Sequence, residues 1–289
     1  MMTSQHVQSS RRADATRVLH DPDAWGNAYD PYFGPGAKEH WRQVVLDRLG
    51  ITEEQLVGKV LLDAGTGPGQ VPYAFTGGPW TVIAIDTSQS IFAARQRLHN
   101  ALNVSFARAN IASLRFLRES LDFVFCLGVL HHTPAPGTYF RSLAEAVKPG
   151  GRLFVFVMSS EQRSFWMYIR AILRPVAKHL PQRGRYLLSW LFAVPLTIGV
   201  NLGLLAAQVL DRAQRSKSGT FAGLVYGSLE LRSLGHVAVG IQDAITFEYY
   251  SQHSQDEVLG WFREAGFESC VSLEGVGVNM SGVKKRSHA

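Results

Sequence analysis

The stretch that decides the fold is Leu61–Gln70, which reads LLDAGTGPGQ. Three glycines stand at alternate positions in it, Gly65, Gly67 and Gly69, directly after an apolar run. Glycine adopts positive φ angles easily and lets a ligand approach the backbone closely. In a helix-covered parallel sheet, ligands bind beyond the carboxyl ends of the strands, where such a loop leaves the first strand. We therefore expect an α/β fold with a ligand at this loop.

The spacing of the glycines and the acidic residue before them indicate the kind of ligand. A dinucleotide-binding loop reads G-x-G-x-x-G, but Gln70 stands at the third glycine's place, and the Gly-Lys-Ser/Thr of a phosphate loop is absent from the sequence. Asp63 lies two residues before the first glycine, and a carboxylate beside a pyrophosphate costs Coulomb energy. The same carboxylate suits S-adenosylmethionine (SAM), which has a sulfonium and an ammonium group and no phosphate.

A second carboxylate, Asp86, ends the next apolar run, about twenty residues after the first glycine. An acidic residue at this place can accept hydrogen bonds from both hydroxyls of a ribose. SAM and dinucleotides both contain ribose, so Asp86 alone does not discriminate between them. A helix-capping carboxylate is the alternative role.

Short apolar runs alternate with helical patterns through most of the chain. The runs do not alternate polar with apolar residues, which fits parallel strands covered on both faces. They are Val60–Asp63, Thr81–Asp86, Val104–Ala107, Leu121–Leu127, Leu153–Met158, Phe267–Leu273 and Gly277–Val283. Helical patterns occupy Ser88–Leu98 and Thr138–Val147 and follow a capping box at Ser254–Glu257. This order predicts a doubly wound α/β sheet.

Residues 159–245 interrupt the alternation and are expected to form a helical insertion. Within them, Leu187–Leu210 carries no charge and is long enough to cross a bilayer, although Pro195 lies inside it. Basic residues recur upstream at helix-compatible spacing beside aromatic side chains; they are Arg163, Arg170, Arg174 and Lys178. Three interpretations stay open: a substrate lid of two helices that meet near Pro195, a peripheral membrane contact, and a membrane-spanning helix.

Four ordered motifs together resemble the class I SAM-dependent methyltransferases, and in particular their quinone-methyltransferase-like small-molecule branch. The motifs read VLLDAGTGPGQ, IAIDTS, LDFVFCLGVLHHTP and AVKPGGRLFVFV. The resemblance covers about residues 57–158 and resumes at EVLGWFREAGF, after the capping box. It implies a Rossmann-like mixed seven-stranded sheet whose last strand is antiparallel, and SAM as the cofactor.

The resemblance also implies which residues bind the methyl donor. They are Asp63, Gly65, Thr66 and Gly67 around the methionine part, Asp86 and Thr87 at the ribose and beside the adenine, Asn110 and Ile111 at the adenine, and Leu127 and Gly128 beside the sulfonium. Two positions depart from the family pattern, since Thr66 replaces a frequent cysteine and Asn110 a frequent acidic residue. Plain core packing is the alternative role of Ile111 and Leu127.

Methyl transfer from a sulfonium needs alignment of the acceptor and, for a phenol or an acidic carbon, a general base. His131 and His132 follow the fourth strand and are the first candidates, although at least one of them is expected to be structural. Tyr250 and His253 precede the last helix and are second candidates, with aromatic packing as their alternative role.

The chain is expected to comprise three parts: residues 1–36, an N-terminal tail with an aromatic gate; residues 37–158 with 246–289, the SAM-binding core; and residues 159–245, the insertion. Within the tail, Trp25 and Tyr29 are expected to cover the donor, or else to pin a hydrophobic tail to the core.

Composition narrows the partners. The net charge is +6, but no nucleic-acid motif accompanies it, so we expect no nucleic-acid partner. No Cys and His spacing suits a metal, and the two cysteines, Cys126 and Cys270, are read as small buried residues in a reducing compartment, which favours the cytoplasm. A hydrophobic small molecule remains as the methyl acceptor. Membrane association and a homodimer are left open, as are two other functions: a cyclisation or rearrangement with SAM as a structural cofactor, and a non-catalytic binding module.

Overall fold

The computed structural model describes residues 33–34, 36–161, 165–214 and 234–286. These residues divide into two compact units. The first lies within residues 30–162 and 248–289 and is called the core unit below, and the second lies within residues 163–247 and is called the insertion unit.

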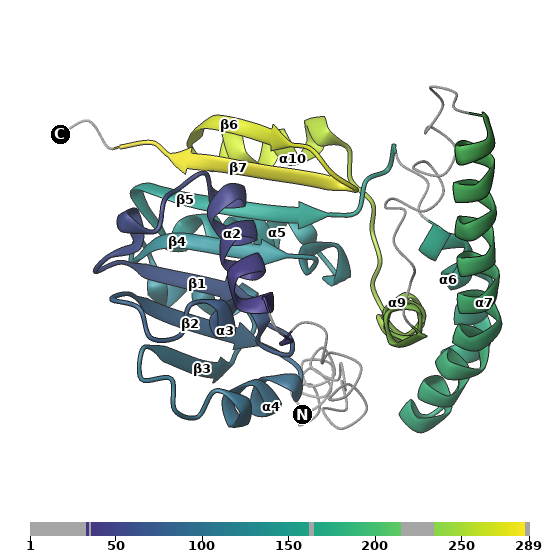
Figure 1. The fold of residues 1–289 in the computed structure, drawn as a ribbon. Coiled ribbons are helices and arrows are strands. Elements are labelled where there is room, and N and C mark those ends of the chain that lie inside the picture. The colour runs from purple at the N-terminus through teal and green to yellow at the C-terminus, as the bar shows by residue number, and fades with distance from the viewer. Residues whose placement is uncertain (1–32, 35, 162–164, 215–233, 287–289) are drawn as a thin grey trace, which may run out of the picture. The chain divides into compact units, whose positions relative to one another are not determined.

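The core unit is built on one seven-stranded sheet with the strand order β3-β2-β1-β4-β5-β7-β6 (Figure 1). The strands are β1 Val60–Ala64, β2 Thr81–Asp86, β3 Val104–Arg108, β4 Leu121–Leu127, β5 Val147–Val157, β6 Phe267–Leu273 and β7 Val278–Lys284. Strands β1 to β5 are parallel, and β7 runs antiparallel to both β5 and β6. The predicted mixed sheet with an antiparallel last strand is therefore confirmed.

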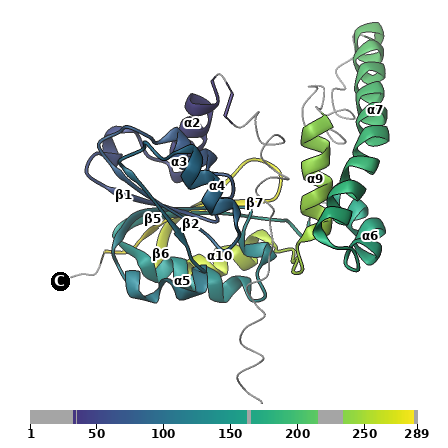
Figure 2. The ribbon, with the colours of Figure 1, turned by 90° about the horizontal axis from the view of Figure 1, so that it is seen from below.

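Helices cover both faces of the sheet, as Figure 2 shows. One face carries α2 Ala37–Leu49 and α3 Gln70–Ala74, and the other carries α5 Pro136–Ala146 and α10 Gln255–Glu264. Helix α4 Ser90–Arg97 and the short 3-10 helices η2 Glu54–Leu56, η3 Ile111–Leu117 and η4 Leu130–His132 complete the unit. A sheet buried on both faces explains why its strands read as continuous apolar runs.

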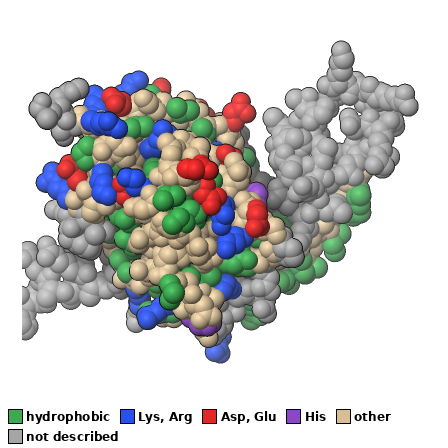
Figure 3. Space-filling view, turned by 60° about the vertical axis from the view of Figure 1, so that its left-hand side comes forward, with side chains coloured by type: hydrophobic (Ala, Val, Ile, Leu, Met, Phe, Trp, Pro, Cys, Tyr) green, Lys and Arg blue, Asp and Glu red, His purple; other side chains and the backbone are tan. Residues whose placement is uncertain are grey.

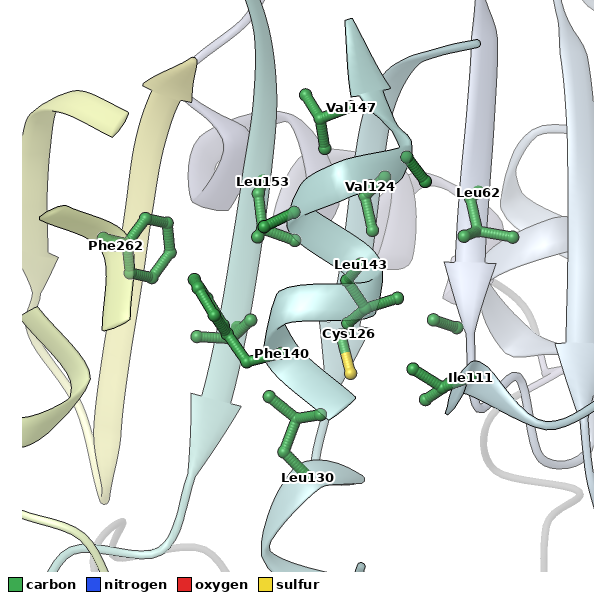
Figure 4. Packing of buried hydrophobic residues seen from close by; sticks show 14 of the residues in the cluster. Leu62, Ile111, Val124, Cys126, Leu130, Phe140, Leu143, Val147, Leu153 and Phe262 are labelled. Atoms are coloured by element: carbon green, nitrogen blue, oxygen red, sulfur yellow. The ribbon is translucent and has the colours of Figure 1, made fainter. Parts of the chain in front are cut away.

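The larger hydrophobic cluster lies between the sheet and the helices α5 and α10. Leu143 of α5 lies over Val124 and Cys126 of β4, and Phe140 of α5 lies toward Phe262 of α10 (Figure 4). Cys126 is fully buried and Cys270 is half-buried, and both are free thiols. The periodic apolar positions of the sequence therefore form the face of α5 that the sheet covers.

The sequence pattern predicts a fifth strand that begins at Leu153, but the strand begins six residues earlier. Strand β5 begins at Val147, which pairs with Leu121, and the pairing then shifts so that Arg152 stands opposite Phe123. The intervening residues form a bulge, in which Gly150 has φ 80°. The KPGG motif therefore ends helix α5 while itself lying in the strand.

The two ends of the insertion are tied together within the core unit. Ser159 and His253 form a β-bridge, and the Gln252 side chain donates a hydrogen bond to the Ser159 carbonyl at 2.7 Å. The His253 amide donates to the Met158 carbonyl, and the Ser160 amide donates to the His253 carbonyl. We call this arrangement, Met158–Ser160 with Gln252 and His253, the stem.

The insertion unit consists of three helices, α6 Phe165–Ala177, α7 Gln182–Gln214 and α9 Leu234–Thr246. They pack around a small cluster that includes Leu173, Ala193 and Ile241. Helix α7 continues through Pro195, so the expectation of two helices meeting there is wrong. Pro195 and Leu191, whose carbonyl loses its helical partner to the proline, both lie on the exposed face of the helix.

Candidate active site

The glycine loop between β1 and α3 adopts the backbone that its sequence requires. Gly65, Gly67 and Gly69 have φ angles of 83°, 52° and 94°, all in the left-handed region. A Cβ atom on Gly65 would clash with the side chain of Val129, which follows β4. The alternate glycines therefore bring the loop after β1 into contact with the loop after β4, at the point where the strand order reverses and such folds bind ligands.

Asp86 ties the glycine loop to the end of β2. Its Oδ2 atom accepts a hydrogen bond from the Gly67 amide at 2.8 Å, and its Oδ1 atom accepts one from the Ser88 amide at 2.8 Å. Ser88 precedes helix α4, so Asp86 does not cap that helix. Each carboxylate oxygen keeps acceptor capacity beyond these bonds, which the predicted contact with two ribose hydroxyls would use.

Asp63 places a buried carboxyl group beneath the loop. Its side chain is almost fully buried, and its Oδ2 atom has no hydrogen-bond partner among the described residues. Burial raises the pKa of Asp63 to about 7; the Thr66 hydroxyl opposes this rise and the charge of Asp86 adds to it. Gln70 Oε1 is likewise buried without a partner in the described structure, whereas the buried Thr66 hydroxyl acts on Asp63. A loop with two such unpartnered oxygen atoms fits a ligand that brings a positive charge and hydrogen-bond donors.

The raised pKa of Asp63 predicts how the stability of the protein without ligand depends on pH. Because the folded-state pKa of about 7 exceeds the ordinary value of 3.8, the folded state holds a proton that the unfolded state releases in this range. Stability therefore falls as the pH rises from about 4 to about 7. We expect Asp63→Asn to remove most of this fall, measured as urea midpoints across the range.

Asp122 supplies the control, because its pKa is shifted in the opposite direction from that of Asp63. Despite partial burial, its hydrogen bonds to Lys148 and the Val60 amide and the nearby Lys59 charge lower its pKa, so its contribution is present above the unfolded-state pKa and lost as the pH falls. The Asp122→Asn variant is expected to keep the fall of stability between pH 4 and 7. Equal slopes for Asp63→Asn and the unmodified protein would contradict the assignment.

The structure places the predicted adenine-binding residues partly in structural roles. The Asn110 side chain accepts a hydrogen bond from the Ala112 amide at 2.9 Å and caps the helix η3. Ile111 is buried within the larger cluster, and Leu127 packs at the edge of the smaller one. Thr87 offers its carbonyl to the Arg108 side chain. Ile111 thus packs in the core, which was its alternative role. The Asn110 side-chain oxygen already accepts one hydrogen bond, so only its second lone pair is left for an adenine amino group.

Three of the four candidate proton acceptors lie together after β4. The ring centres of His131 and His132 are 4.1 Å apart, and those of His132 and Tyr250 are 5.8 Å apart. Gly128, with φ 76°, turns the chain out of β4 toward them. The segment before the last helix is held there because the Ser251 amide donates to the His131 carbonyl at 2.9 Å.

The two adjacent histidines have different environments. His131 is buried, and burial together with the charges of His132 and His253 holds its pKa well below the ordinary value, so its imidazole is neutral. His132 is half-buried, and its Nδ1 atom lies 3.2 Å from the Tyr249 carbonyl. Because a carbonyl oxygen only accepts hydrogen bonds, this contact favours the tautomer with the proton on Nδ1 and the lone pair on Nε2.

His253 has a structural role in addition to any catalytic one. Its Nε2 atom lies 2.8 Å from Ser251 Oγ, and its Nδ1 atom lies 2.9 Å from Glu257 Oε1. Glu257 belongs to the predicted capping box, in which the Ser254 side chain accepts a hydrogen bond from the Glu257 amide. Both ring nitrogens thus hold the start of α10 and the stem, which makes His253 a positioning residue.

Sequence reasoning missed Gln70 and Val129, which the structure adds to the site. Gln70 begins helix α3, and its position as the missing third glycine was the available signal. Val129 carries no sequence signal, because its contact with Gly65 joins two distant loops. Trp25 and Tyr29, the predicted gate, lie outside the described residues.

Comparison with known proteins identifies the class of this domain. Residues 62–155 match a family model described as a methyltransferase domain. A ubiquinone biosynthesis O-methyltransferase of Pseudomonas fluorescens (strain Pf0-1) is 31% identical over 113 residues, which are 38% of this chain and 49% of the relative. The enzyme of the same name from Coxiella burnetii (strain Dugway 5J108-111) is 30% identical over 129 residues, 43% of this chain and 54% of the relative. The chain thus spans about half the length of the curated relatives it matches.

Two solved structures share the fold over most of the chain. The methyltransferase in complex with the Haloferax volcanii Trm112 methyltransferase activator aligns with 92% of this chain and 98% of its own, at 15% identity and a TM-score of 0.52. The carbon methyltransferase CurJ aligns with 92% of this chain and 61% of its own, at 15% identity and a TM-score of 0.51. At this identity they show the fold alone.

The match over residues 62–155 and the seven-stranded sheet agree with one another, and this part of the chain is similar to a methyltransferase domain. The names of the curated relatives agree with the small-molecule, quinone-methyltransferase-like resemblance of the motifs and with SAM as the expected cofactor.

Proposed function

We propose that this protein transfers the methyl group of SAM to an oxygen or carbon atom of a hydrophobic small molecule. The observation that carries the proposal is the pair of carboxylates at the glycine loop, Asp63 and Asp86, of which the first is buried and incompletely bonded. Such a loop would repel the phosphates of a dinucleotide and suits a cationic donor. The relatives named as ubiquinone biosynthesis O-methyltransferases support an acceptor of similar chemistry.

Some residues of this chain would bind SAM, and another would accept the proton that the methyl acceptor loses. Bound SAM supplies a methyl group that is already activated on a sulfonium, so the protein chiefly aligns donor and acceptor. Asp63 offers a buried carboxyl group, which a bound cation keeps ionised, and Asp86 offers oxygens to a ribose while it holds the loop in place. His132, with its lone pair on Nε2, takes the proton that the acceptor loses.

The direct test is mass spectrometry of reactions with SAM deuterated on its methyl group and with phenolic and quinone-type acceptors. We expect a product heavier by one labelled methyl in place of a hydrogen, together with S-adenosylhomocysteine. An isomeric, unlabelled product would instead indicate a cyclisation or rearrangement, and a protein that binds no SAM would indicate a non-catalytic module.

Replacing Asp86 by alanine is expected to weaken SAM binding by more than about tenfold. The variant loses the ribose contact and leaves the Gly67 amide without its charged partner, and hydrogen bonds to charged groups contribute about 1.5–3 kcal/mol. Isothermal titration calorimetry with SAM measures the change.

The matched control is Asp122→Ala at the opposite end of the sheet. Asp122 also accepts a hydrogen bond from a backbone amide, that of Val60, and its Oδ2 atom lies 2.8 Å from Lys148 Nζ. This variant is expected to lose stability and to keep its affinity for SAM. An unchanged affinity of Asp86→Ala would reject the ribose role.

A further inference from the structure

One long segment of the chain carries basic residues and no acidic ones. Between Glu161 and Asp211 the sequence contains no acidic residue and six basic ones: Arg163, Arg170, Arg174, Lys178, Arg183 and Arg185. The whole chain has 29 basic and 23 acidic residues, so outside this segment 23 basic residues balance 23 acidic ones. On the face of the molecule in Figure 3, basic and acidic side chains of the core unit are interspersed. The formal charge of this segment therefore equals the net charge of the chain, and its described cations lie on helices α6 and α7 and on the turn between them.

The same two helices expose a continuous line of large apolar side chains, here called the apolar stripe. On α7 they recur at intervals of three and four residues, and on α6 at intervals of four, which places them on one helix face. They are Leu187, Leu191, Val194, Ile198, Leu202 and Leu205 of α7, and Tyr168, Ile172 and Val176 of α6. Leu191 is 69% exposed and Ile198 57%. The part of the stripe on α7 is about 27 Å long at 1.5 Å per residue.

Exposed cations lie at the turn between α6 and α7, at one end of the stripe. Lys178 and Arg183 are both exposed. Arg185 donates hydrogen bonds to the carbonyls of Ala177 and Leu180 and so caps the end of α6. A positive turn beside an apolar face is the pattern of helices that lie on anionic lipid surfaces.

Length and composition alone would also allow α7 to span a bilayer. Residues Arg183–Gly203 form the one stretch among the described residues that is long and apolar enough to do so, and only 11% of it is buried. However, the opposite side of α7 packs with α6 and α9 around Ala193. Arg170 of α6 donates to the carbonyls of Ala244 and Phe247 in this bundle. A spanning position would draw these polar groups into hydrocarbon at high cost, whereas a position in the interface immerses only the stripe.

We propose that α6 and α7 dock this protein on an anionic lipid surface, with the apolar stripe immersed at the level of the acyl chains and Lys178 and Arg183 at the lipid phosphates. A second copy of the chain is the rival occupant of an apolar face. Between Glu161 and Asp211 a second copy offers no acidic residue to pair with Lys178 and Arg183. The lipid surface satisfies both the apolar and the charged part of the face.

The test is flotation of the full chain with vesicles. We expect binding to mixed phosphatidylglycerol–phosphatidylcholine vesicles that weakens with added salt, and much weaker binding to phosphatidylcholine alone. Leu191→Glu is expected to lower the partition coefficient about tenfold or more. Its matched control is Val276→Glu, at a residue 67% exposed in the core unit, which is expected to bind as the unmodified protein does.

A second pair of variants tests the charges. Lys178→Gln with Arg183→Gln is expected to lower binding to the anionic vesicles roughly 10- to 30-fold, at about a tenfold loss per 1.4 kcal/mol and about 1 kcal/mol per cation. Lys285→Gln with Arg286→Gln removes two exposed cations of the core unit and is expected to leave binding unchanged. Circular dichroism confirms that each variant is folded.

Three results would overturn the proposal. They are an unmodified protein that stays away from the anionic vesicles, equal losses in the stripe variant and its control, and release from the vesicles only by detergent, which would indicate a spanning helix. Light scattering without vesicles distinguishes lipid docking from dimerisation. A dimer that Leu191→Glu dissociates would assign the apolar stripe to a second copy of the chain. None of these readings depends on methyl transfer, so they are separable from the proposed function.

Discussion

Replacing Gly65 by alanine is expected to lower the free energy of unfolding by about 2–5 kcal/mol and to abolish SAM binding. The φ angle of 83° costs a residue with a Cβ about 1–2 kcal/mol. The new Cβ would also clash with the Val129 side chain, and overpacking of this kind costs about 1–3 kcal/mol. Relief of the clash would move the loop that carries the site. Urea unfolding and calorimetry with SAM measure the two effects.

Two further variants separate the causes. Gly67→Ala adds a Cβ in open space at φ 52°, so it is expected to cost only the backbone part, about 1–2 kcal/mol. In a Val129→Ala background the cost of Gly65→Ala is expected to fall to that same backbone part, which a double-mutant cycle shows as a coupling of about 1–3 kcal/mol. Additive effects would show that the two loops do not touch.

Replacing His132 by alanine is expected to lower kcat roughly a hundredfold or more while SAM affinity stays nearly constant. General acid–base catalysis contributes about 10²–10⁴-fold, and His132 is the histidine of the pair that is accessible to an acceptor, since His131 is buried and neutral. An imidazole base also predicts that the low-pH limb of the rate profile disappears in the variant.

His99→Ala provides the control for this prediction. His99 is exposed, and its Nδ1 atom lies 3.0 Å from the Gln96 carbonyl, much as that of His132 lies near the Tyr249 carbonyl. Loss of the His99 imidazole is expected to leave kcat unchanged. A His132→Ala variant with normal kcat, or with an unaltered pH profile, would move the proton acceptor elsewhere.

The predictable part of the fold is the part governed by local pattern. The glycine loop was recognisable because positive φ angles at Gly65, Gly67 and Gly69 favour one residue type, and that residue type is visible in the sequence. The strands were recognisable because both faces of the sheet are covered, so that β4 is buried along almost its whole length.

The unpredictable part depends on contacts between distant segments. The His132 contact with the Tyr249 carbonyl joins residues 117 positions apart, and no spacing rule indicates it. Helix α7 persists through Pro195 because that face of the helix is exposed, which the sequence alone does not state. Asn110 became a helix cap because η3 begins beside it. In each case the partner, which the sequence leaves unknown, decides the role.

The stem gives the chain a modular construction. Ser159 and His253 pair side by side, and the Gln252 side chain is hydrogen-bonded to Ser159. The chain therefore leaves the core unit and returns to it at neighbouring points. Insertions are tolerated best where the two ends of the inserted segment lie close together. The insertion can therefore be lengthened, shortened or exchanged while the glycine loop and the histidine pair stay in register. Evolution can replace the insertion without altering the core unit, and a protein engineer can graft another segment at the stem.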